Sequence, residues 1–109
     1  MGKRSGLEST LVGVAGEYFV AAELSIRGYL ATITLRNSRG IDIIASNSDA
    51  TRSVSIQVKA SNGNVPKWML AQKAESFNAD NHFYVFVLLR DVGFRPDFHI
   101  VPRTSFKTP

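Results

Sequence analysis

Apolar residues recur at three- and four-residue spacings along the early part of the chain. This period is typical of an α-helix with one apolar face, and it predicts a helix over about Leu7–Arg27 that ends at Gly28. Gly13 and Gly16 would each weaken this helix by about 1 kcal/mol relative to alanine. We therefore interpret the two glycines as positions where the helix packs closely against a sheet.

Three segments with the patterns of β-strands follow this helix. They are Leu30–Leu35, Ile41–Ala45 and Ser53–Ala60. The third segment alternates apolar with polar residues, which predicts one buried face and one polar face. Asn47–Asp49 predicts a turn before this segment, and Ser61–Asn64 predicts a loop after it.

The second half of the chain predicts one more helix and two more strands. Pro66 suits the first turn of a helix over Lys67–Phe77. His82–Leu89 is apolar without alternation, which is typical of a strand covered on both faces. Phe98–Val101 predicts a short final strand after a turn.

The predicted element order, αβββαββ, indicates an α/β fold. The strands Ser53–Ala60 and His82–Leu89 are separated by a helix, which favours a right-handed parallel crossover between them. The three earlier strands are close enough along the chain to form an antiparallel meander. We therefore expect a mixed β-sheet flanked by helices.

A length of 109 residues indicates a single domain over residues 1–109. The segment that starts at Pro102 resembles the approach to a helix, so we interpret the domain as compatible with a further C-terminal helix after Pro109. The chain has no cysteine, which excludes disulfides, thiolate zinc sites and cysteine nucleophiles. We see no signal peptide and no apolar run of membrane-spanning length, so we expect a soluble cytoplasmic protein with no membrane partner.

The formal net charge of +4 favours a polyanionic partner such as DNA. The preference is mild because the thirteen Lys and Arg residues are dispersed along the sequence. We see no Gly-rich phosphate loop and no Ser-His-Asp arrangement. We interpret His82 and His99 as structural residues of strands.

Four polar residues on the predicted helix and strands form the candidate site. Gln57 and Lys59 are two residues apart on one strand and so share a face. Asp42 lies at the preceding strand, and Glu17 lies within the apolar stripe of the first helix. Each residue alone fits an ordinary structural role, but together they could hold a divalent cation and a water beside a phosphate.

The order of these residues resembles the PD-(D/E)XK, or restriction-endonuclease-like, nuclease superfamily, and within it the small Holliday-junction-resolvase-like group. The resemblance covers about the first sixty residues. It is carried by Gly16–Leu24 (GEYFVAAEL), Gly28-Tyr29, Ser38–Asp42 (SRGID) and Gln57-Val58-Lys59. It implies a restriction-endonuclease-like core and a homodimer as one possible assembly, although no sequence feature demonstrates a dimer.

The resemblance also implies residue roles and a Mg²⁺ or Mn²⁺ cofactor. Asp42 would be the principal metal ligand, Glu17 a supporting ligand or organiser, and the main-chain carbonyl of Val58 a further ligand. Lys59 would orient the attacking water. Gln57 departs from the pattern, because these nucleases more often have Glu or Asp there, and an amide keeps an oxygen ligand but lacks the negative charge.

Basic residues beside these motifs are candidates for contact with the DNA backbone. Arg36 and Arg39 precede Asp42, and Lys67 follows the predicted loop. The alternative is that these three are solvated loop charges. We interpret the neighbouring Trp68 as a core residue.

The sequence therefore predicts a metal-dependent endonuclease that hydrolyses DNA phosphodiester bonds and selects structure rather than sequence. A first alternative is a catalytically silent nucleic-acid-binding domain with a nuclease fold, in which Gln57 has removed metal binding. A second alternative is an interaction protein whose basic charge is incidental.

Overall fold

The structure is a computed structural model that describes residues 8–34, 40–63 and 81–102. It is an α/β fold in which one helix packs on a five-stranded mixed sheet of strand order β1-β2-β3-β4-β5. The elements are α1 (Ser9–Ile26), β1 (Leu30–Ile33), β2 (Ile43–Ser46), β3 (Ser53–Asn62), β4 (His82–Leu89) and β5 (Asp97–Pro102). The predicted helix over Lys67–Phe77 and the C-terminal helix lie outside the described residues.

The helix α1 ends where the sequence predicts. Gly28 has φ +93°, a left-handed conformation that favours glycine. The N–H of Tyr29 donates to the carbonyl of Leu24 at 3.0 Å, and the N–H of Gly28 donates to the carbonyl of Ser25 at 3.0 Å. These bonds satisfy carbonyls of the last helical turn and direct the chain into β1.

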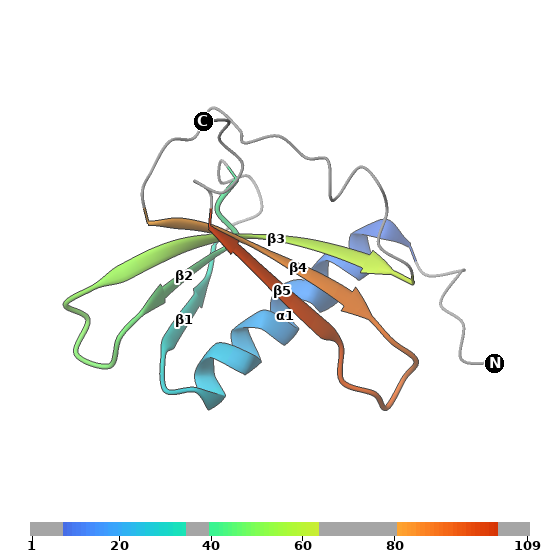
Figure 1. Ribbon diagram of the computed structural model, residues 1–109, viewed down its shortest axis with the longest axis horizontal. Coiled ribbons are helices and arrows are strands. Elements are labelled where there is room, and N and C mark those ends of the chain that lie inside the picture. Colours follow the sequence, from blue (N-terminus) through green and yellow to red (C-terminus); the bar gives the residue numbers. More distant parts are fainter. Residues whose placement is uncertain (1–7, 35–39, 64–80, 103–109) are drawn as a thin grey trace.

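The sheet combines antiparallel and parallel pairing as predicted. β1, β2 and β3 form an antiparallel meander, β3 and β4 are parallel, and β4 and β5 are antiparallel. Figure 1 shows the five strands side by side, with β1 and β5 at the two edges. Both faces of β4 are buried, which confirms the interpretation of its continuous apolar run.

The end of β3 was predicted incorrectly, and β2 begins at Ile43 instead of the expected Ile41. Ser61 and Asn62 were expected in a loop, but they continue β3, paired with Leu88 and Leu89 of β4. Their polar side chains hid the strand, because the pairing depends on partner residues that lie 27 residues further along the sequence.

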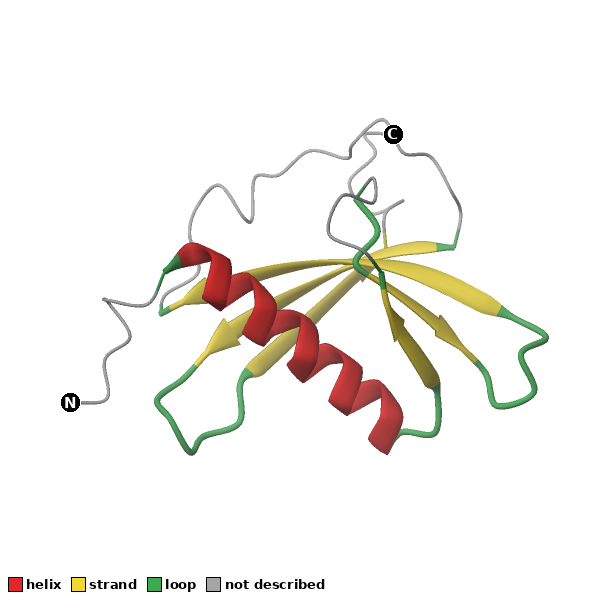
Figure 2. Ribbon diagram, turned by 180° about the vertical axis from the view of Figure 1, so that it is seen from behind, coloured by secondary structure: helices red, strands yellow, loops and turns green. Residues whose placement is uncertain are grey.

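The helix covers one face of the sheet, as Figure 2 shows. A β-carbon added at Gly16 would lie 2.7 Å from the β-carbon of Ala60 and 3.4 Å from Val58 Cγ1. Gly16 therefore lets the helix approach β3, as predicted. Gly13 has no atom within 4 Å of such a position, so its interpretation as a contact residue was wrong.

The main core lies between α1 and the face of the sheet that α1 covers, which we call the helix face. It contains buried aliphatic residues of the helix and of β2, β3 and β4, among them Val12, Val20, Ile43, Ile56 and Val87. Tyr84 and Phe86 form a separate buried cluster with Val101. Residues of β4 alternate between the two clusters, as the two-residue period of a strand requires.

Candidate functional site

Asp42 lies immediately before β2, where its main chain is held from both sides. Its N–H donates to the carbonyl of Ile56 on β3 at 2.8 Å, and its carbonyl accepts from the N–H of Thr34 at 2.9 Å. Its carboxylate oxygen Oδ2 accepts a hydrogen bond from the N–H of Val58 at 2.7 Å. The carboxylate is therefore fixed between the start of β2 and the middle of β3.

This contact leaves part of the Asp42 carboxylate available. The second oxygen, Oδ1, forms no hydrogen bond with the residues that the structure describes. The N–H of Val58 points toward Asp42, and the carbonyl of a strand residue points to the same side as its N–H. The Val58 carbonyl therefore belongs to the same side of β3 as the Asp42 carboxylate.

The side chain of Gln57, on β3, lies beside the backbone that leads to Asp42. A β-carbon added at Gly40 would lie 3.5 Å from Gln57 Oε1, so the carboxamide lies against the backbone two residues before Asp42. Gly40 has φ +62°, which favours glycine, and the missing side chain leaves room for the amide. The structure thus brings Asp42, Gln57 and the Val58 main chain together.

Lys59 is half-buried on β3, two residues beyond Gln57. The alternation of strand side chains places both residues on the same face of the sheet. Within the described ranges, the Lys59 ammonium has no ion pair or hydrogen bond. Lys59 therefore lies on the same face of β3 as Gln57, as the sequence predicts.

Glu17 approaches the sheet from the other side. It follows Gly16 on α1, and Gly16 contacts the face of β3 that carries Val58 and Ala60. Because Gln57 and Lys59 alternate with those residues, they project from the opposite face. The main chain of Glu17 therefore lies on the helix side of β3, and its role as a supporting ligand or organiser stays a prediction.

The remaining sequence predictions fall into two groups. Arg36, Arg39 and Lys67 lie outside the described residues, as does Trp68. His82 is 1% exposed and its Nδ1 lies 2.8 Å from Ser55 Oγ, which agrees with a structural role.

A metal site can also be formed by a cluster of His, Cys, Asp or Glu side chains. Within residues 8–34, 40–63 and 81–102, no three His, Cys, Asp or Glu side chains gather as a metal would require. The expected site does not depend on such a cluster, because it uses two carboxylates (Asp42 and Glu17), one amide and one main-chain carbonyl.

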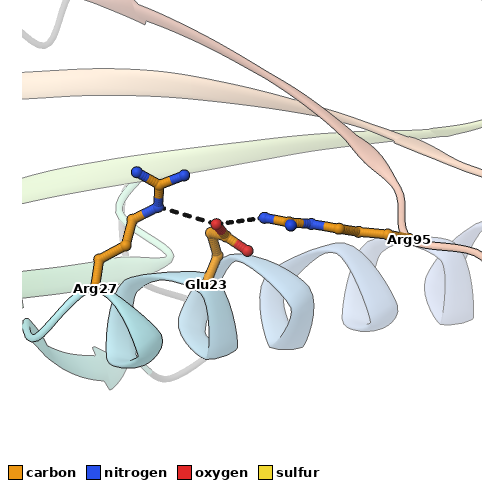
Figure 3. A network of polar contacts seen from close by, with 3 residues as sticks. All are labelled: Glu23, Arg27 and Arg95. Atoms are coloured by element: carbon orange, nitrogen blue, oxygen red, sulfur yellow. Dashed lines mark hydrogen bonds and ion pairs between the residues drawn. The ribbon is translucent and has the colours of Figure 1, made fainter.

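Sequence reasoning missed an ion-pair network on the helix face. Figure 3 shows Glu23 between Arg27 and Arg95. Glu23 Oε2 lies 2.9 Å from Arg27 Nε and 2.5 Å from Arg95 Nη2. The four-residue spacing is typical of the Arg27 contact, but no local signal indicates Arg95, which comes from the connection between β4 and β5.

Comparisons with models of known protein families, with curated proteins and with solved structures find no match to this chain. Among the described helices, none is long and apolar enough to cross a membrane.

Proposed function

We propose that this protein is a metal-dependent endonuclease that hydrolyses DNA phosphodiester bonds and selects structure rather than sequence. One observation supports the proposal most directly. The Asp42 carboxylate, the Gln57 amide and the Val58 main chain meet beside a half-buried lysine on the same strand. A restriction-endonuclease-like core belongs to this proposal, because the helix, the meander and the parallel β3–β4 pair are compatible with it.

The donor set is suited to Mg²⁺ or Mn²⁺. Hard divalent cations take oxygen ligands, and the site offers Asp42 Oδ1, Gln57 Oε1 and the Val58 carbonyl. A bound cation would supply Lewis-acid polarisation of the scissile phosphate and a more acidic bound water.

The protein's own groups would position the reactants. The hydrogen bond from Val58 holds the Asp42 carboxylate in one orientation, so it need not reorganise when a ligand arrives. The Lys59 ammonium would stabilise negative charge on the phosphate oxygens and orient the attacking water. Glu17, on the helix side of β3, would be a supporting ligand or a ligand organiser.

A second candidate function is a catalytically silent nucleic-acid-binding domain. One observation favours it. Gln57 lacks the charge of a carboxylate, so β3 supplies an amide oxygen where a carboxylate would bind a cation more tightly. Loss of that charge weakens Mg²⁺ binding, because affinity for a hard cation rises with the charge of its ligands.

Cleavage of branched, linear and single-stranded DNA with Mg²⁺ or Mn²⁺ tests the first function. Asp42→Asn and Lys59→Gln are each expected to lower the rate by about 100-fold or more, the usual loss for a group that stabilises transition-state charge. Asp42→Asn retains an oxygen that can accept the Val58 N–H, so it removes charge with little effect on the fold. Gln57→Glu should raise the rate or lower the Mg²⁺ concentration required.

Titration calorimetry with Mn²⁺ separates the two candidates. The nuclease predicts heat that Asp42→Asn abolishes and Gln57→Glu increases. DNA binding that persists without any Mn²⁺ heat would favour the silent domain. Cleavage that survives both Asp42→Asn and Lys59→Gln would show that the site proposed for the reaction is wrong.

A further inference from the structure

A second feature of the molecule is independent of the proposed nuclease site. A groove of about 1090 Å³ lies on the helix face, between the C-terminal half of α1 and the edge strand β5. We call it the α1–β5 groove. Its floor is apolar and is formed by Leu24, Val54, Ile56, Val85, Phe98 and Ile100.

The groove exists because one helix is too narrow for this sheet. α1 crosses the helix face obliquely, as Figure 2 shows, and the strands extend beyond it toward β5. Phe98 on β5 is only partly buried against the core, and Ile100 is 69% exposed although its strand neighbour Val85 is buried. Apolar surface of the sheet is therefore open at this side of α1.

The rim of the groove carries more positive than negative charge. Arg27, Arg52 and Arg95 line it together with Glu23 and Asp97. Glu23 is shared by Arg27 and Arg95, so this group of three keeps one uncompensated positive charge. Asp97 lies 3.5 Å from Arg90, which is outside the groove. In the part of the chain that is described, the Arg52 guanidinium has no ion-pair partner.

Arg95 is held in place before any ligand arrives. Its guanidinium carbon lies 5.9 Å from the ring centre of Phe98, and its Nη2 contacts Glu23 (Figure 3). A guanidinium held by a carboxylate and an aromatic ring loses little side-chain entropy when it binds an anion. The groove therefore combines an apolar floor with a prepared cationic rim.

This combination selects among possible occupants. A second copy of the chain would bring arginines of one rim against arginines of the other, and it would add to the repulsion between two molecules of net charge +4. A cationic amphiphile meets the same repulsion. An apolar body with a single negative charge matches both the floor and the rim.

We propose that the α1–β5 groove binds a small amphipathic carboxylate with a linear apolar tail. The lining runs from β2 to β5, which is three inter-strand spacings or about 14 Å. A saturated chain of the length of decanoate fits this span, with its carboxylate at Arg52, which precedes the start of β3. The volume of about 1090 Å³ slightly exceeds the usual range for small-molecule pockets, about 300–1,000 Å³.

Titration of the full chain with decanoate, decyltrimethylammonium and decanol tests this proposal, with binding followed by calorimetry and by amide shifts in NMR spectra. Decanoate should bind saturably and shift residues of β5 and of the β3 start, and it should bind at least about tenfold more tightly than the other two compounds. Arg52→Gln should weaken decanoate binding by about tenfold. Lys59→Gln, which removes the same charge from the opposite face, should leave it unchanged.

Ile100→Asp provides a second variant, because an exposed edge position tolerates the change and the new charge enters the groove. It should weaken decanoate binding while the circular dichroism spectrum stays that of the wild type. Equal binding of decanoate and the ammonium compound, or shifts confined to β1, would overturn the proposal. A dimer in solution that Ile100→Asp dissociates would also overturn it, since a second copy would then cover the groove.

Discussion

The Asp42 carboxylate accepts a hydrogen bond from β3 just beyond the last residue pair of β2 and β3, where a main-chain carbonyl would otherwise be the acceptor. Its Oδ2 satisfies the N–H of Val58, which would otherwise be left unpaired at the end of the β2–β3 ladder. A hydrogen bond from an amide to a carboxylate is stronger than one between neutral groups. Asp42 therefore supports the sheet and the site together, and loss of activity in a variant has to be compared with its stability.

The two helical glycines of α1 give the clearest stability prediction at single residues. Gly16→Ala places a β-carbon 2.7 Å from that of Ala60, and neither atom can rotate away. We expect it to lower the free energy of unfolding by about 1–3 kcal/mol. Gly13→Ala meets no atom within 4 Å and should raise it by about 0.5–1 kcal/mol. Urea unfolding of both variants measures the difference, and equal stabilities would show that α1 does not contact β3 at Gly16.

Residue patterns in the sequence predicted part of the site and missed the rest for a physical reason. The alternation along β3 placed Gln57 and Lys59 on one face, because a strand has a fixed period of two. Helical periodicity does not specify which face of the sheet α1 covers, so the position of Glu17 relative to Lys59 could not be derived from the sequence. The contact of Gly40 with Gln57 likewise requires strands already in register.

The order of the elements was more predictable than their ends. Runs of apolar residues located all five described strands and α1, and the helix expected between β3 and β4 implied their parallel pairing, which the structure confirms. The end of β3 was missed because Ser61 and Asn62 gain their strand conformation from β4. The α1–β5 groove was missed because its lining comes from elements that only the folded sheet brings together.

Glu23 links α1 to the connection before β5, so the packing of these elements should depend on pH. The hydrogen bond from Arg27, followed by the charge and hydrogen bond of Arg95, holds the pKa of Glu23 below its ordinary value of 4.5. A lowered pKa stabilises the folded state above the unfolded-state pKa, and this contribution is lost as the pH falls through the folded-state value. The wild type should therefore exceed Glu23→Gln in stability at neutral pH, with a gap that closes below about pH 4.5.

Unfolding by urea at a series of pH values measures this gap. Asp91→Asn is the matched control, since it removes one exposed carboxylate that forms no ion pair with the described residues. Its stability relative to the wild type should vary less with pH. A gap for Glu23→Gln that stays constant into the acid range would mean that the ion pairs with Arg27 and Arg95 are not formed in solution.

At the scale of the whole molecule, two charged regions lie on opposite faces of one sheet. Lys59 projects from the face away from α1, whereas Arg52 and Arg95 belong to the groove on the helix face. A net charge of +4 does not by itself say which face meets a polyanion. We propose that DNA meets the first face and that a small carboxylate binds the second.

The salt dependence of DNA binding decides between the faces. Each phosphate neutralised by a lysine or arginine releases counterions, so the logarithm of the binding constant falls with the logarithm of salt concentration by about 0.9 per contact on duplex DNA. Lys59→Gln should therefore lower this slope by about one contact, and Arg52→Gln should leave it unchanged. Fluorescence anisotropy of labelled DNA over a range of salt concentrations, without divalent metal, measures both slopes. If Arg52→Gln lowers the slope and Lys59→Gln does not, DNA binds the helix face of the sheet. The assignment of Lys59 to the phosphate would then be wrong.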